Sequence, residues 1–152
     1  MIPSTVERVK QNTAEHINQK IREETEARIA VCAARERAAI DERLAELDYE
    51  WDIERTLEAN AATVALVGLT LGATVDRRWF ILPGVVAGFL LQHAVQGWCP
   101  PVPILRRLGF RTAAEIDHER YALKLLRGDF QRVKTNDPLT ADPGEVLAAM
   151  ER

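Results

Sequence analysis

Two long uncharged stretches, separated by three charged residues, constrain the fold of this chain more than any other feature. The first stretch is the 17 residues 59–75, the second is 79–105, and the charged residues are 76–78. As a helix, the 21 residues 79–99 span about 31 Å, close to the hydrocarbon thickness of a bilayer. A three-residue connection makes the two stretches antiparallel neighbours, and in lipid both must be helical.

The sequence therefore predicts an all-α protein built around a two-helix transmembrane hairpin at residues 57–105, with spans at about 57–75 and 79–99. The alternative is a soluble helical bundle that buries the same pair of helices. Trp79 and Trp98 bracket the second span, where an interfacial aromatic belt would lie, and they favour lipid.

Each span contains a GxxxG motif, the small-residue pattern that lets helix backbones approach closely. Gly68 and Gly72 form the motif of the first span, and Gly84 and Gly88 form that of the second. Folding the chain back about Arg77 brings the two motifs to overlapping depths. We expect them to pack against each other, or against a second copy of the chain in a homo-oligomer.

Polar side chains also share a depth, in the half of the hairpin nearer the chain termini. The set consists of Asn60, Gln92, His93 and Gln96. Ionisable groups inside a membrane are functional candidates. A lone neutral histidine beside two glutamines is not a proton relay, so we expect interhelical hydrogen bonds that hold the hairpin or an oligomer.

The arrangement of basic residues predicts the orientation of the hairpin. The turn offers Arg77 and Arg78, whereas the terminal side offers a larger set: Arg43, Arg55, Arg106, Arg107, Arg111 and Arg120. This six-to-two excess places both termini in the cytoplasm of a bacterial-type inner (plasma) membrane. The N-terminus lacks the apolar region of a secretory signal peptide. No basic stripe points to a nucleic-acid partner.

Residues 1–56 are expected to form a cytoplasmic helical arm. Ser4–Glu7 has the pattern of a capping box, and neither glycine nor proline follows until Gly68. One helix would thus run from about Thr5 into the first span, with a bend near Trp51. A thin apolar stripe runs along residues 5–51. It predicts either a parallel coiled coil that oligomerises the chain or docks a cytoplasmic protein, or a lone charged helix near the membrane.

Residues 106–130 are expected to form a short juxtamembrane amphipathic helix. Arg106, Arg107 and Arg111 precede it as a basic cluster at the lipid surface, where they would contact headgroup phosphates. A capping box at residues 112–115 opens the helix and Gly128 ends it. A polar tail, 131–152, carries a short terminal helix opened by Asp142 as N-cap and Pro143.

Cys99 is the candidate thiol for chemistry. No histidine or acid stands near it in sequence as a base, the next residue is proline, and a helix C-terminal end disfavours a thiolate. His93 is six positions away and on another helical face, so we expect neither a metal site nor a cofactor. Packing at a helix end that Pro100 and Pro101 terminate is the favoured role. In the cytoplasm the thiol would be reduced.

Three segments carry a resemblance to a known family: "DIERTLEANAATVALVGLTLG", "GWCPPVPILRRLGFRT" and "EIDHERYALKLLRGDF". From about Trp51 to Phe130 the chain resembles the small membrane domains grouped as DUF2892, also called the YgaP-like transmembrane domain. The resemblance implies a self-associating inner-membrane hairpin with cytoplasmic termini. Some members carry a sulfurtransferase domain upstream, but residues 1–50 lack its cysteine loop, so that activity is not carried over.

These observations predict a non-enzymatic inner-membrane protein, a self-associating anchor that presents a cytoplasmic helical surface. One alternative is a membrane-bound thiol relay, in which Cys99 takes sulfane sulfur or an electron pair from a separate sulfurtransferase partner. Another is passage of a small anion through an oligomer of hairpins, with His93 and the arginines along the route.

Overall fold

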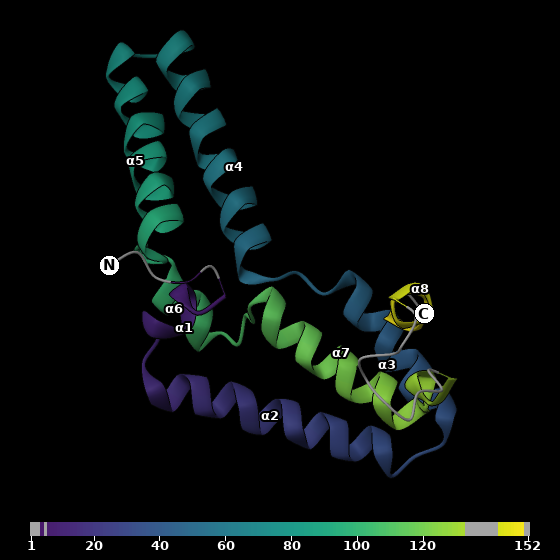
Figure 1. Ribbon diagram of the computed structural model, residues 1–152. Coiled ribbons are helices and arrows are strands. Elements are labelled where there is room, and N and C mark those ends of the chain that lie inside the picture. Colours follow the sequence, from purple (N-terminus) through teal and green to yellow (C-terminus); the bar gives the residue numbers. More distant parts are fainter. Residues whose placement is uncertain (1–3, 5, 133–142, 151–152) are drawn as a thin grey trace. The chain divides into compact units, whose positions relative to one another are not determined.

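A computed structural model describes residue 4 and residues 6–132 and 143–150 of the chain, and these residues form helices and no strand (Figure 1). The all-helical class expected from the sequence is confirmed. The elements in chain order are α1 (Arg8–Gln11), α2 (Glu15–Ala33), α3 (Arg37–Tyr49), α4 (Ile53–Thr74), η1 (Arg77–Phe80), α5 (Ile81–Gln96), α6 (Val102–Arg107), α7 (Ala113–Arg127), η2 (Asp129–Arg132) and α8 (Pro143–Met150).

The chain divides into two compact units, and each is described by itself. Unit 1 comprises Met1–Glu23 and Trp51–Glu115, and unit 2 comprises Glu24–Glu50 and Ile116–Arg152. The divisions fall within α2 and α7. They cut across the expected boundaries at residues 56, 105 and 130, because segments distant in sequence pack together in each unit.

Unit 1 is built on the antiparallel pair α4 and α5, which pack along each other (Figure 1). Asp52 begins α4, since its side chain accepts a hydrogen bond from the Arg55 amide at 2.7 Å. Asp76 plays the same part at the turn, accepting from the Arg78 amide at 2.8 Å. The short turn and η1 reverse the direction of the chain, as we expected from the three-residue connection between the two uncharged stretches.

The second helix of the pair ends earlier than expected. Gly97 adopts φ of 75° and its amide donates to the His93 carbonyl at 2.7 Å, so α5 stops at Gln96. A left-handed residue at this position suits glycine, which has no Cβ to clash. The prediction that Pro100 and Pro101 end the helix is therefore wrong. The prolines instead precede α6.

The N-terminal arm is not one long helix. It is interrupted at residues 12–14, 34–36 and 50–52, so α1, α2 and α3 are separate elements. None of these interruptions contains glycine or proline. The chain gives up helical hydrogen bonds there and gains burial of its thin apolar stripe, which an isolated helix would leave in water.

Much of that apolar stripe is buried in the core of unit 2. Ile40, Leu44 and Leu47 of α3 are buried with Ile116 and Leu123 of α7, and partly buried Ile29 and Cys32 of α2 pack against them. Buried Glu119 is held there by Arg43, whose Nε donates to its Oε1 at 2.8 Å. This part of the stripe thus packs on α7 of the same chain, and a coiled coil with a second chain stays a prediction.

The predicted boundaries of the C-terminal helices hold. The Thr112 amide donates to Glu115 Oε2 at 2.8 Å and the Glu115 amide to Thr112 Oγ1 at 3.3 Å, which is the reciprocal capping box at the start of α7. Gly128, with φ of 88°, follows its last residue. The terminal helix α8 begins at Pro143, as predicted. The expected cap Asp142 lies outside the described residues.

Leu123→Ala tests the core of unit 2. Leu123 is fully buried, so we expect the substitution to lower the free energy of unfolding by about 2–5 kcal/mol. The matched control is Leu125→Ala on the same helix, 66% exposed, which should change it by less than about 0.5 kcal/mol. Denaturant unfolding of the full chain in mild detergent measures both, and equal losses would contradict the assignment of this core.

Candidate membrane anchor and its polar base

The α4–α5 pair leaves most of its apolar surface uncovered. Its helices are long and apolar enough to cross a membrane: α4 has 22 residues, about 33 Å at the usual rise, and residues 77–96 form the second. In the most apolar window of each, only 22% and 6% of the residues are buried. A core helix of a soluble protein would be mostly buried. The exposed large side chains include Val64, Leu66, Val67, Leu69, Ile81, Val85, Phe89, Leu90 and Leu91.

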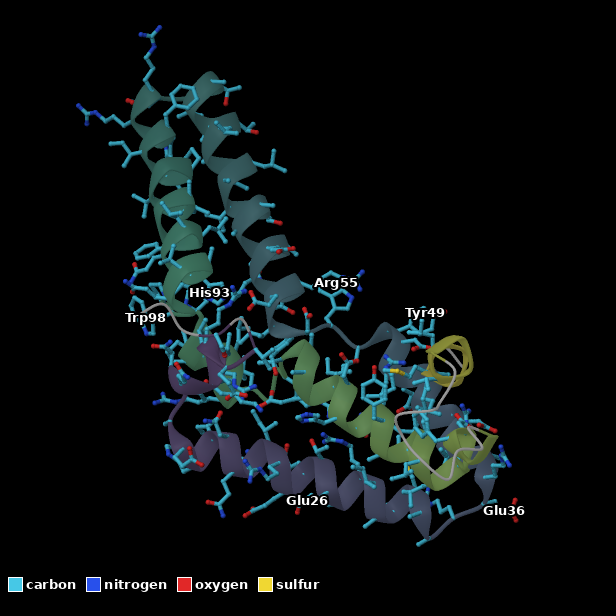
Figure 2. All side chains as sticks on the ribbon, viewed as in Figure 1. Glu26, Glu36, Tyr49, Arg55, His93 and Trp98 are labelled. Carbon is cyan, nitrogen blue, oxygen red and sulfur yellow. The ribbon has the colours of Figure 1, made fainter. Side chains whose placement is uncertain are left out.

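Aromatic side chains lie exposed at both ends of the pair. Trp79 is 43% exposed beside the turn, and Trp98 is 36% exposed just after α5. Sequence reasoning assigned no interfacial role to Trp51, 46% exposed before α4, whose ring lies 4.4 Å below the Arg55 guanidinium in a cation–π contact. Figure 2 shows Arg55, His93 and Trp98 at the end of the pair away from the turn. This is the distribution of an interfacial belt.

The two glycine motifs do not pack against each other. A Cβ on Gly68 would meet Pro83 of α5 at 2.7 Å, and one on Gly72 would meet the Phe80 ring of η1 at the same distance, so the two glycines make room for α5 and for the turn. Beside Gly84 and Gly88 there is open space. With Pro83 turned to α4, Gly84 points about 100° away from that helix.

The expected polar patch is not one cluster. Asn60 is exposed and donates to the Thr56 carbonyl of its own helix at 2.8 Å. His93 instead is 4% exposed, and its Nε2 lies 2.7 Å from Oε2 of Glu54, a residue that sequence reasoning missed. Gln96 contributes a backbone carbonyl, and no hydrogen bond of the Gln92 side chain is among the described contacts.

Side chains of α1 complete a polar cluster beneath the helix pair, called here the base cluster: Arg8, Asn12, Glu54 and His93. Arg8 Nη2 donates to Glu54 Oε1 at 3.0 Å, and its Nη1 donates to the Ala94 carbonyl at 3.3 Å. Asn12 Nδ2 donates to the Gln96 carbonyl at 2.8 Å. The last carbonyls of a helix have no partner within it. The base cluster therefore caps α5 from another segment.

The three arginines expected at the lipid surface differ in exposure. Arg106 and Arg111 are 1% and 3% exposed, so the prediction of a headgroup contact is wrong for both. Arg106 donates to both carboxylate oxygens of Glu115, at 2.6 and 2.9 Å, and also to the Phe110 carbonyl and to Asn18. Arg107 is exposed, and for it a headgroup contact stays a prediction.

The Arg106–Glu115 pair sets the charge state of this part of unit 1. Burial by itself raises the pKa of Glu115. Hydrogen bonds from Arg106 and the Thr112 amide, with the positive charges of Arg106 and Lys10, outweigh burial and hold that pKa below its ordinary value. Both partners are thus charged at neutral pH, and the buried guanidinium is compensated.

Cys99 lies in a hydrophobic cluster beneath the helix pair, with Val9, Ile53, Leu57 and Val102. It is 4% exposed and forms no disulfide. Burial raises the pKa of the Cys99 thiol and the negative charge of Glu54 raises it further, while the Val102 amide partly offsets this. A buried neutral thiol is a poor nucleophile, so the surroundings of Cys99 favour packing over chemistry.

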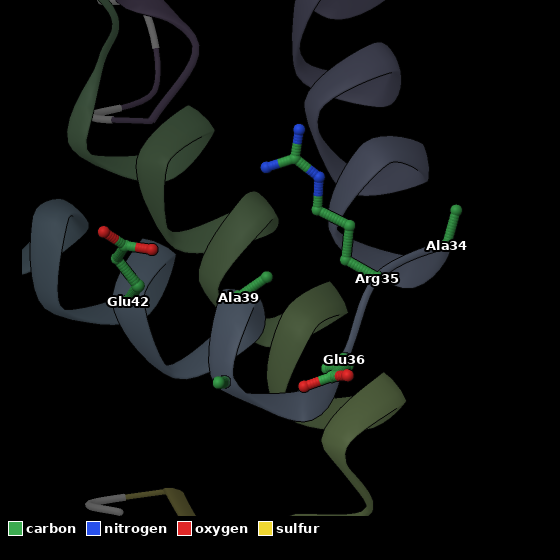
Figure 3. A pocket seen from close by; sticks show the side chains of 6 residues that line it. Ala34, Arg35, Glu36, Ala39 and Glu42 are labelled. Carbon is green, nitrogen blue, oxygen red and sulfur yellow. The ribbon is translucent and has the colours of Figure 1, made fainter.

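The described residues contain no group of three or more histidine, cysteine or acidic side chains that could hold a metal ion. A surface hollow lies in unit 2 where α2 turns into α3 (Figure 3). It is lined by Ala34, Arg35, Glu36, Ala38, Ala39 and Glu42. These small and solvated charged side chains include neither a nucleophile nor a general base placed against one.

No family model, curated protein or solved structure matches the chain. The resemblance of residues 51–130 to the YgaP-like domains stays a prediction.

Arg106→Ala tests the buried ion pair. The variant leaves Glu115 buried without its partner, so we expect the free energy of unfolding to fall by about 3–5 kcal/mol. The adjacent Arg107→Ala is the control, because Arg107 is exposed and has no ion pair among the described contacts. Denaturant unfolding in detergent measures both. Similar stabilities of the two variants would show that the Arg106 contacts do not hold this unit together.

Proposed function

We propose that this protein is a non-enzymatic anchor of the bacterial inner membrane, in which α4 and α5 cross the bilayer and self-associate. The observation that carries the proposal is the uncovered apolar surface of the pair, 6% and 22% buried in its two apolar windows. In water, an apolar surface exposed along two whole helices would drive aggregation, whereas lipid chains cover it without exposing it to water. Tryptophans at both ends of the pair support the same location.

The proposed orientation has both termini in the cytoplasm and the turn outside. It is supported by the excess of arginine beside the terminal end of the pair, against Arg77 and Arg78 at the turn. Unit 2 would then lie in the cytoplasm. Its exposed Tyr49, Tyr121 and Leu125, 83%, 39% and 66% exposed, offer apolar contacts to a cytoplasmic protein partner.

Two other functions are less well supported. Burial of Cys99 and its raised pKa weigh against a thiol relay, which needs an accessible thiolate. His93 is bonded to Glu54, and a carboxylate beside the route disfavours passage of an anion.

Val85→Arg tests the membrane location. Val85 is 48% exposed near the middle of the second span, and an arginine there raises the cost of insertion by about 2.5–3.5 kcal/mol. We expect the wild-type chain to stay in the membrane fraction after alkaline carbonate extraction, and the variant to be depleted from it. Leu125→Arg in unit 2 is the control and should behave as wild type. Release of the wild-type chain into the soluble fraction would refute the proposal.

Gly88→Ile tests self-association through α5. The open space beside Gly84 and Gly88 would allow another helix to approach closely, and a branched side chain would prevent this. We expect several-fold weaker association of fluorescently labelled chains in lipid vesicles, measured by energy transfer. Ala87→Ile adds the same side chain at the neighbouring exposed position and should have a smaller effect. Equal association of wild type and Gly88→Ile would exclude this interface.

A further inference from the structure

The short helix α1 closes the base of the helix pair. It has four residues, too few to be helical on its own, so its shape depends on its contacts. Arg8 bonds to Glu54 and to the Ala94 carbonyl, and Asn12 bonds to the Gln96 carbonyl. The last turn of α5 is therefore covered by side chains that lie more than 80 positions away in sequence.

The same helix covers the hydrophobic cluster that contains Cys99. Val9, 2% exposed, is the residue of α1 in that cluster, and Cys99 is 4% exposed there. The Arg8 backbone lies so close to α5 that a Cβ on Gly97 would come within 2.6 Å of its carbonyl carbon. Glycine at this position is thus required twice, by the left-handed backbone and by the approach of α1.

Little apolar burial holds α1 in place. Val9 is its one buried side chain, and the other contacts are polar. Arg8 is paired with Glu54, but its Nε is buried without a hydrogen-bond partner, so its lost hydration is only partly replaced. A short segment with few apolar contacts opens at a lower free energy than the rest of a fold. Helix α1 therefore contributes to the burial of Cys99 through Val9 and is itself held by little apolar contact.

We propose that α1 is a strap that opens and closes over the base of the helix pair and controls access to the Cys99 thiol. In the closed state Val9 packs in the hydrophobic cluster that buries the thiol. In the open state Cys99, the Glu54 carboxylate and the carbonyls of Ala94 and Gln96 meet water. The strap goes beyond the proposed anchor function, because it depends on contacts within unit 1 and not on where the helix pair is located.

Alkylation of the full chain by iodoacetamide in detergent micelles measures the opening of the strap. Modification of Cys99 and Cys32 is followed over time at fixed neutral pH by peptide mass spectrometry. Arg8→Ala removes the charged hydrogen bond to Glu54, so we expect Cys99 to react about tenfold faster. Cys32, in unit 2, should react at its wild-type rate. Arg8→Lys, which keeps the charge, should give an intermediate rate.

Two further variants separate opening from other effects. Asn12→Ala removes a neutral contact of α1, so a faster reaction of Cys99 in this variant reports opening and not a changed ionisation of the thiol. Arg35→Ala, at an exposed site in unit 2, is the control and should leave both rates unchanged. An unchanged Cys99 rate in Arg8→Ala and Asn12→Ala, or an equal acceleration of Cys32, would overturn the strap. Neither result bears on the membrane location of the helix pair, which carbonate extraction tests separately.

Discussion

The buried guanidinium of Arg106 is the interaction on which the arrangement of unit 1 depends. Removing an arginine from water costs several kcal/mol unless good partners replace the lost hydration. Here Glu115, the Phe110 carbonyl and Asn18 supply them. The pair fixes α6 against the cap of α7, and Val102 on the same short helix enters the cluster beneath α4. A contact that looks like lipid recognition in sequence is thus internal.

The base cluster provides hydrogen-bond partners for the C-terminal end of α5, where apolar surroundings give way to polar ones. Carbonyls in the last turn of α5 have no partner in the helix and, in lipid, none in the solvent. Arg8 and Asn12 bind two of them. Glu54 then forms an ion pair with Arg8 and bonds to His93, while Arg8 Nε and His93 Nδ1 are buried without a hydrogen-bond partner among the described residues.

The sequence predicted what depends on local pattern. The helix pair, its turn, the capping box at Thr112, and the ends at Gly128 and Pro143 follow from charge, spacing and backbone preference. It failed where a tertiary contact outweighed a local preference. Arg35 and Glu36 favour helix, yet the chain turns there so that α3 packs on α7. No sequence pattern marks Asn12 or Glu54 as a contact of α5, because only the tertiary fold brings them beside that helix.

Unit 1 combines buried or half-buried arginines with exposed large aliphatic side chains. Its arginines at positions 8 and 106 point inward to carboxylates, with exposures of 22% and 0% for their side chains. Leu66, Ile81 and Leu91 point outward, each more than 60% exposed. In water this arrangement loses both hydration of charge and burial of apolar surface. In a bilayer each placement is favourable, because lipid covers the exposed aliphatic side chains and the ion pairs need no solvent.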